Sequence, residues 1–299
     1  VDGQFDVTEV FAEANIPVIE NGFIDELSFE LGYRYSNYST GVTTDTYKAL
    51  VNFAPIPAVR FRGGYNRAVR APNILNLFSP NRVALFSGSD PCAGATPDYT
   101  QAQCVNLGVP ASRYGTVAAS PAGQYNQFIG GNPNVEPEKA DTYTAGVVIQ
   151  PQSILPGFVA SVDYFNINVD NAISSIGAQT ALNQCGLTGD PLFCNLVNRA
   201  PGSLTLWTPG SFVTNTTQNI GGVKTSGVDV SASYSRAIGP GGLSLSFNGS
   251  YLAEFVIDTG IPGTDTDGKY DCTGYHGLVC GTPRPEWGHQ LRAGYTLDS

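Results

Sequence analysis

Apolar and polar residues alternate one by one along several long stretches of the chain, the period at which successive strand side chains point to opposite faces of a sheet. The segments 228–235 and 243–251 place valine, alanine, leucine or an aromatic residue at one parity and mostly serine at the other. In the segment 27–35 the apolar positions are Leu27, Phe29, Leu31, Tyr33 and Tyr35. The pattern predicts β-strands with one apolar and one polar face.

Nine such strands are expected along the chain. Globular strands are usually about five or six residues long, whereas strands that span a membrane need about 9–11. Most of the expected strands reach the longer class, and their length therefore favours a membrane barrel. They cover roughly 5–16, 26–38, 44–54, 59–66, 139–150, 158–170, 223–237, 243–256 and 286–298.

The connections between these strands alternate in length. The first, third, fifth and seventh are short, whereas the fourth, sixth and eighth are long and cover 67–138, 171–222 and 257–285. Because antiparallel strands reverse direction each time, all the long connections leave the sheet on one side. Bacterial outer-membrane barrels have this arrangement, with short periplasmic turns and long extracellular loops.

Alternation alone also describes a soluble β-sandwich or a lectin-like domain. Strand length and one-sided loops favour the membrane, as do aromatic residues near the predicted strand ends, at Tyr35, Tyr38, Tyr65, Phe255 and Trp287. The expected fold class is all-β: an antiparallel transmembrane β-barrel, present as an incomplete segment of about nine strands with long extracellular loops.

Composition narrows the class further. Hydrophobic residues make up 41% of the 299 residues and charged ones 13%, but no run approaches the roughly 18 apolar residues that a membrane helix needs. The formal net charge of -10 argues against a nucleic-acid partner, which would require a basic surface. A helical membrane protein and a nucleic-acid-binding protein are both excluded.

The six cysteines form three close pairs, all in the long connections: Cys92 with Cys104, Cys185 with Cys194, and Cys272 with Cys280. Short loops close at the lowest entropic cost, so the spacing predicts three local disulfides and an oxidising compartment. No pair has C-x-x-C spacing, and neither histidine stands at zinc-site spacing from a pair, so no metal site is expected. We expect the disulfides to stiffen the loop rim, and crossed pairs or free thiols in mass mapping would contradict this.

The most specific motif of the chain is Arg70-Ala71-Pro72, preceded by Arg67 and followed by Leu77-Phe78. This motif resembles the barrel of TonB-dependent receptors. Downstream, 131–139 with Pro137 and Glu138 is similar to the family's N-x-x-L-x-P-E entrance to the next strand, and 162–167 to its V-D-Y-Y-x-I strand. Lys139 and Ala145 depart from the family pattern at positions where serine and glutamate are common.

The resemblance implies an outer-membrane receptor that takes up a scarce ligand, such as siderophore-bound iron, cobalamin or an oligosaccharide, by energised transport. It implies three partners: outer-membrane lipid, the TonB energy-transducing complex acting through a plug domain, and the small-molecule ligand. No cofactor is expected. A receptor barrel has about 22 strands, and no plug, signal peptide or terminal aromatic strand is recognised, so residues 1–299 are expected to be the central part of a longer barrel.

Four arginines are candidate lumen or ligand residues, namely Arg60, Arg62, Arg67 and Arg70. They could meet an anionic ligand or acidic groups of the plug, or form ordinary ion pairs within the lumen. Loop aromatics could stack on a sugar or a planar chelate, or pack among themselves. They are Tyr99, Tyr114, Tyr125, Phe128, Trp207 and Phe212.

The chain offers little for catalysis. Its two histidines, His276 and His289, belong to no Ser/His/Asp set, so we expect no enzyme. The acidic stretch 265–271 lacks the glycine and glutamate positions of a calcium loop. Two alternative functions remain open: a passive porin, which would lack a plug, and a secreted adhesin or lectin, which would partition into buffer without detergent.

Overall fold

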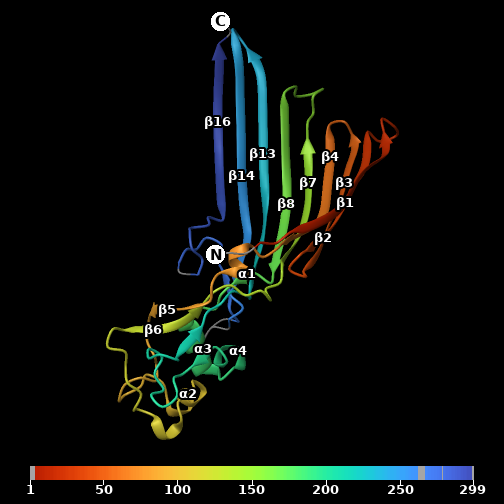
Figure 1. Cartoon of the computed structure of the whole chain (residues 1–299). Helices are drawn as coiled ribbons and strands as arrows, with labels where there is room; N and C mark the ends of the chain where they lie inside the picture. The colour runs from red at the N-terminus through yellow and green to blue at the C-terminus, as the bar shows by residue number, and fades with distance from the viewer. Residues whose placement is uncertain (1–3, 262–266, 278, 298–299) are drawn as a thin grey trace.

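The computed structural model describes residues 4–261, 267–277 and 279–297, and a single antiparallel sheet dominates them (Figure 1). Nine of its strands are 11 to 18 residues long. A tenth, β15 (Lys269–Asp271), pairs with the end of β14. The nine are β1 (Val7–Glu20), β2 (Glu26–Tyr38), β3 (Thr43–Ile56), β4 (Val59–Arg70), β7 (Glu138–Ile149), β8 (Phe158–Asp170), β13 (Gly222–Ile238), β14 (Gly241–Asp258) and β16 (Trp287–Leu297).

These nine strands confirm the nine expected from the alternation. Each pairs with its neighbour in chain order, from β1 to β8 and then through β13 and β14 to β16. The boundaries differ most in β1, which runs to Glu20 rather than to residue 16, and in β4, which continues to Arg70 rather than ending at 66. Arg67 and Arg70 therefore lie within a strand and not in the following loop.

The two faces of the sheet differ in polarity as the alternation predicts. Val162 of β8 lies opposite Val147 of β7 and Val230 of β13 on one side, which we call the apolar face. One residue along, Ser161 and Ser231 share a hydrogen bond of 2.9 Å on the polar face. On the apolar face Phe61 is 47% and Leu291 71% exposed. Such a surface suits the hydrocarbon core of a bilayer, with the polar face toward a wet lumen.

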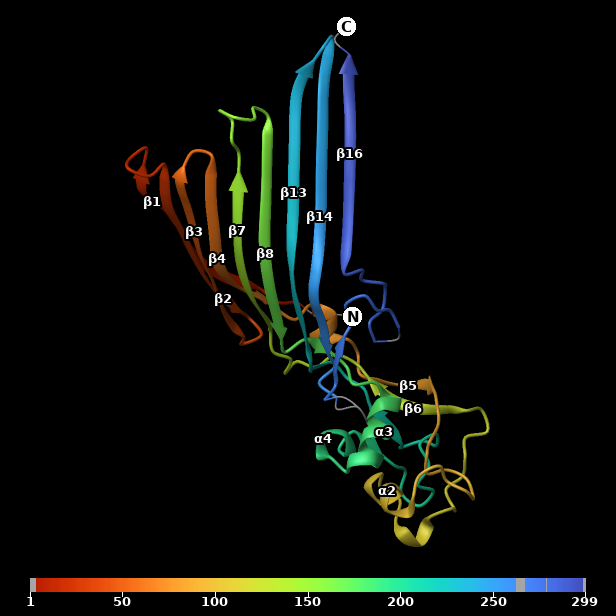
Figure 2. The same ribbon diagram turned by 180° about the vertical axis from the view of Figure 1, so that it is seen from behind.

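Short and long connections leave opposite ends of the sheet, as Figures 1 and 2 show. Residues 21–25, 57–58, 150–157 and 239–240 form the turns at one end. At the other end are 39–42 and the three long connections 71–137, 171–221 and 259–286. Among the described residues, no helix is long and apolar enough to cross a membrane.

The connections 71–137 and 171–221 fold together into a separate body, which we call the loop unit. Its four-stranded sheet has the order β10-β11-β6-β5, and the parallel pair of β6 with β11 joins the two connections. The first connection contains α1 (Ile74–Phe78), β5 (Arg82–Ser87), α2 (Gln101–Asn106), η1 (Ala111–Arg113) and β6 (Gln124–Ile129). The second contains β9 (Ile173–Ser174), α3 (Ala178–Thr188), α4 (Pro191–Cys194), β10 (Val197–Asn198), β11 (Phe212–Thr214) and β12 (Gln218–Asn219).

The loop unit contains the apolar core of the described chain. Leu107 and Val109 from the first connection pack in one cluster with Leu182, Phe193 and Leu206 from the second. These side chains are at most 1% exposed. The connections 71–137 and 171–221 are therefore not open loops but a small folded domain at one end of the sheet, which the sequence pattern did not predict.

Candidate functional site

Three ion pairs on the polar face of the sheet cross an intervening strand. Arg62 of β4 donates from Nε and Nη2 to both carboxylate oxygens of Asp163 on β8, each at 2.7 Å. Arg60 of β4 reaches Glu26 of β2 at 2.8 Å. Lys48 of β3 contacts Glu30 of β2 at 2.6 Å and Glu13 of β1 at 3.2 Å. The two candidate arginines on this face are thus neutralised by carboxylates of the barrel wall.

A small residue on the intervening strand makes each crossing possible. Gly146 of β7 lies opposite both Arg62 and Asp163, and a Cβ on Gly146 would overlap the Asp163 carboxylate. Gly32 of β2 is covered in the same way by the Lys48 chain. Ala54 of β3 lies under the pair of Arg60 with Glu26. It is opposite Glu26 in strand register and is 2% exposed. The position of small residues in the sequence therefore decides which charges can meet.

Arg67 lies on the apolar face, and the expectation that it lines the lumen is wrong. Residues 61 to 70 of β4 continue without a register shift against β7, so Arg67 shares the parity of Phe61 and Tyr65 rather than that of Arg60. Its guanidinium donates to both oxygens of Asp141 at 2.7 Å and lies 5.5 Å from the centre of the Tyr47 ring. Because successive side chains of a strand point to opposite faces, an error of one residue in the alternation assigns a side chain to the wrong face.

Arg67 belongs to an aromatic band near the loop end of the sheet. The ring centres of Tyr47 and Tyr65 are 5.8 Å apart, and those of Tyr65 and Tyr143 are 4.8 Å apart. The Tyr65 hydroxyl donates to Asp141, as the Tyr33 hydroxyl does to Asp45. Aromatic residues with wet polar tips mark the level at which a barrel leaves the hydrocarbon core.

The fourth arginine joins the two halves of the family motif. Arg70, the last residue of β4, donates from Nε and Nη2 to the two oxygens of Glu138, the first residue of β7, each at 2.6 Å. The same carboxylate accepts the backbone N–H of Ile173 at 2.6 Å. Glu138 thus ties the base of the first long connection to the start of the second.

The other motif residues turn the chain out of the strand. Pro72 and Pro137 are buried, and Ala71 is half-buried, beside this ion pair. Asn73 then caps α1, since its side chain accepts the Asn76 backbone N–H and the Asn76 side chain accepts that of Asn73. The motif therefore builds the root of the loop unit.

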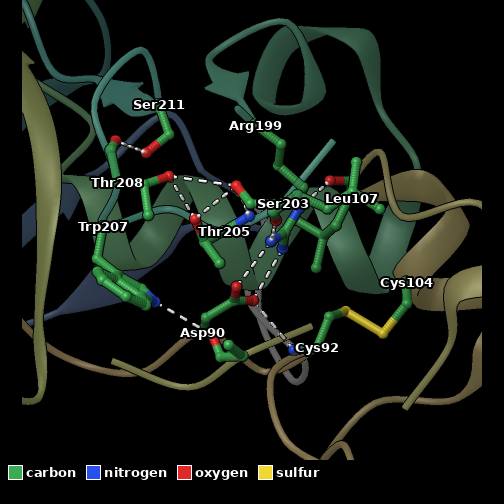
Figure 3. Close-up of polar contacts among 12 residues, drawn as sticks. Asp90, Cys92, Cys104, Leu107, Arg199, Ser203, Thr205, Trp207, Thr208 and Ser211 are labelled. Carbon is green, nitrogen blue, oxygen red and sulfur yellow. Dashed lines mark hydrogen bonds and ion pairs between the residues drawn. A yellow bond between two sulfur atoms is a disulfide. The ribbon is translucent and has the colours of Figure 1, made fainter. Parts of the chain in front are cut away.

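A buried ion pair holds the loop unit together (Figure 3). Arg199 binds both carboxylate oxygens of Asp90 at 2.7 and 2.8 Å, and the two side chains are 3% and 1% exposed. Arg199 also donates to the carbonyl oxygens of Leu107 and Leu204, while Asp90 accepts the Cys92 backbone N–H. The partners come from different connections, and no local pattern in the sequence indicates that they meet.

The three disulfides join the cysteines as their spacing predicts. Cys92–Cys104 and Cys185–Cys194 each close a short segment within the loop unit, and Cys272–Cys280 does so in the third long connection. Cys92, Cys104 and Cys185 belong to the apolar core of the loop unit. The first two disulfides therefore reinforce the body that Asp90 and Arg199 hold together.

The six loop aromatics pack among themselves or bond to backbone. Tyr125 is 5% exposed, and the ring centres of Phe128 and Phe212 are 5.3 Å apart. Tyr114 donates to the Tyr99 carbonyl oxygen at 2.8 Å, and Trp207 to that of Ala118 at 3.1 Å. Burial raises the pKa of the Tyr99 hydroxyl, with a smaller contribution from the charge of Asp98. These contacts favour the packing interpretation of the aromatics over a stacking platform.

No metal-ligand cluster is found in the part of the chain that the structure describes. In the acidic stretch, Asp265 and Thr266 lie outside the described residues. Asp271 accepts the backbone N–H of Thr273 at 3.0 Å, and this bond lowers the pKa of its carboxyl. Asp271 therefore acts as a turn residue.

The geometry is that of a barrel wall: an apolar face with an aromatic band, a polar face with internal ion pairs, and long connections at one end. The model of the TonB-dependent receptor-like β-barrel family matches residues 2–298. The chain belongs to this family. TonB-dependent receptors are receptors and not enzymes, which agrees with the expectation from the sequence. No curated protein matches the chain.

Solved receptors share the fold. A variant of the ferric enterobactin receptor from Pseudomonas aeruginosa is 17% identical with a TM-score of 0.54, over 84% of this chain and 27% of that receptor. The siderophore receptor PirA from Acinetobacter baumannii is 13% identical with a TM-score of 0.53, over 83% of this chain and 28% of that one. A second variant of the P. aeruginosa receptor, in complex with enterobactin, is 16% identical with a TM-score of 0.54. The match covers 86% of this chain and 31% of that receptor. Residues 1–299 thus span about 30% of the length of these three solved receptors.

Proposed function

We propose that residues 1–299 are the central part of the barrel of an outer-membrane receptor that takes up a scarce ligand by energised transport. The open sheet carries this proposal. Among the described strands, β1 pairs only with β2 and β16 only with β14. Unpaired strand edges in hydrocarbon cost several kcal/mol for each backbone group, so the lipid-facing sheet requires further strands.

The proposed partners follow from the two faces and from the family. Outer-membrane lipid covers the apolar face, where Phe61 and Leu291 are exposed. A plug domain occupies the lumen beside the polar face and receives energy from the TonB complex. The ligand is a small molecule such as a metal chelate, cobalamin or an oligosaccharide. In support of a chelate, the similar solved structures include receptors for siderophores, one of them bound to enterobactin.

The test has two steps. The first is to read the DNA on both sides of the segment that encodes residues 1–299, where we expect a plug domain upstream and further alternating strands downstream. The second is to express the whole receptor and measure uptake of ferric enterobactin, cobalamin and maltoheptaose with and without TonB. Uptake that requires TonB supports the proposal. Barrel strands without a plug, or uptake independent of TonB, would instead indicate a passive porin.

A further inference from the structure

The polar face of the sheet has two different walls. The strands β1 to β4, together with β7 and β8, carry the crossing ion pairs of Lys48, Arg60 and Arg62, and we call this part the charged wall. The strands β13 and β14 carry small hydroxyl side chains instead, and we call this part the hydroxyl wall. It consists of Ser231, Ser233, Ser235, Ser244, Ser246 and Ser250.

An open groove of about 500 Å³ runs across the hydroxyl wall. Ser161, Ser231 and Ser250 line it together with Asn248 and Gln290. Hydroxyl and amide groups both donate and accept hydrogen bonds, so a polar molecule can exchange partners along these five side chains without breaking an ion pair. On the charged wall the same movement would have to compete with bidentate Arg–carboxylate bonds, which are among the stronger hydrogen bonds in proteins.

The charges beside the groove are unfavourable for an anion. Asp163 and Asp229 both line the groove, and the described residues place no cation within 4.0 Å of Asp229. In strand register Asp229 lies opposite Asp163, whose carboxylate is already bound to Arg62. Arg292, the cation on β16, lies opposite Ser246, nearer the turn end than the pair of Asp229 with Ser250. A ligand arriving from the loop end therefore meets a carboxylate first.

The connections at the loop end of the sheet add further negative charge. Residues 39–42, 71–137, 171–221 and 259–286 contain five basic and eight acidic residues. One of the five, Arg199, is buried against Asp90. A second, Arg284, lies over the Phe255 ring at 3.9 Å. An excess of acidic groups around an opening lowers the local concentration of anions.

We infer that the groove on the hydroxyl wall is the passage for the ligand, and that this ligand carries no net negative charge and is rich in hydroxyl or amide groups. The inference rests on the proposed transport function and narrows it. Among chelates it selects neutral ones, and it places an oligosaccharide ahead of a polyanionic catecholate complex.

The test uses the whole receptor in its own outer membrane, with single cysteines introduced as Ser231→Cys and Ser250→Cys in the groove. Asn66→Cys is the matched control, since Asn66 is an exposed residue on the polar face of β4 and belongs to none of the ion pairs. The six cysteines of residues 1–299 are all disulfide-bonded, so the introduced cysteine is the one free thiol in this part of the receptor. Reaction rates with an uncharged, sugar-bearing thiosulfonate and with an anionic thiosulfonate are measured, with and without TonB.

We expect the groove cysteines to react at least about fivefold faster with the uncharged reagent than with the anionic one, after each rate is divided by the rate of the same reagent with a free thiol in solution. One carboxylate at a few ångströms accounts for about that factor. The variant Asp229→Asn should remove the preference at Ser250→Cys, and Asn66→Cys, which lies opposite Lys48, should show no preference for the uncharged reagent. Equal rates for the two reagents in the groove, the same preference at Asn66→Cys, or no reaction in the groove would overturn the inference. If the groove cysteines show the same charge preference with and without TonB, the result supports the groove as the passage but contradicts energised transport.

Discussion

Arg70 and Glu138 form two hydrogen bonds of 2.6 Å at the point where the chain leaves β4 and returns in β7. The two residues belong to the Arg-Ala-Pro and Pro-Glu motifs, which are separated by the whole of the connection 71–137. Because Glu138 also accepts the Ile173 N–H, a single carboxylate anchors both connections of the loop unit to the barrel. The motifs therefore carry a structural role at the root of the loops.

The substitution Glu138→Ala tests this role. It leaves the Ile173 N–H without its acceptor and Arg70 without its partner, and Arg70 is 52% exposed, so the loss should be only about 1 kcal/mol. We expect hydrogen exchange of the segment 171–177 to become about fivefold faster in the whole receptor. Glu136→Ala is the control, since its contacts with Asn219 use only its backbone. Equal exchange in the two variants would refute the anchoring role.

Gly146 should be required for the ion pair between Arg62 and Asp163. A Cβ at this position would displace the Asp163 carboxylate, so Gly146→Ala should lower the stability of the barrel by about 1 kcal/mol, the order expected for a partly exposed pair. Thermal loss of compact gel mobility measures this. Arg62→Ala should then have no further effect in the Gly146→Ala background. The control is Gly63→Ala, where the nearest atom to the new Cβ is 3.5 Å away. Additive effects of Arg62→Ala and Gly146→Ala would show that the glycine does not act through the ion pair.

Removal of one partner of the buried pair of Asp90 with Arg199 should destabilise the loop unit more than removal of both partners. Asp90→Asn leaves a buried guanidinium without its carboxylate, which costs roughly 3–5 kcal/mol. We expect rapid protease cleavage within 71–137 on intact cells, while the exposed Arg113→Ala remains resistant. The double variant Asp90→Leu/Arg199→Leu should recover part of the resistance, because no charge is left buried. A double variant that is cleaved faster than Asp90→Asn would contradict this account.

The loop unit should lose stability at alkaline pH through Tyr99. Burial raises the pKa of the Tyr99 hydroxyl in the folded state above its value of about 10 in the unfolded chain. The contribution of neutral Tyr99 to stability is therefore complete below about pH 10 and is lost as the pH rises through the folded-state pKa. In the whole receptor, the fluorescence difference between the parent protein and a Trp207→Phe variant isolates the signal of Trp207, which reports the unfolding. Tyr99→Phe should move the alkaline transition to higher pH. An unchanged transition in Tyr99→Phe would exclude Tyr99 as the responsible group.

The sequence predicts the wall of the barrel better than it predicts the loop unit, and the reason is physical. Alternation of the kind seen at Val230 and Ser231 is a local property, so strands and faces can be read one segment at a time. Arg67 shows the limit, since β4 continues beyond residue 66 and its unbroken alternation places Arg67 on the apolar face. The contact of Asp90 with Arg199 joins residues 109 positions apart, and it depends on a fold that local patterns do not encode. The disulfides could be predicted because each pair closes a short segment.

The most direct test of the central claim is the environment of successive residues in β13. Nitroxide labels placed one at a time from 228 to 235 in the whole receptor, in its outer membrane, would report collisions with oxygen dissolved in lipid and with a water-soluble nickel chelate. A barrel wall predicts accessibility of period two, with 228, 230, 232 and 234 in lipid and 229, 231, 233 and 235 in water. Access of the nickel chelate to both parities would contradict the barrel account and indicate a sheet in solution.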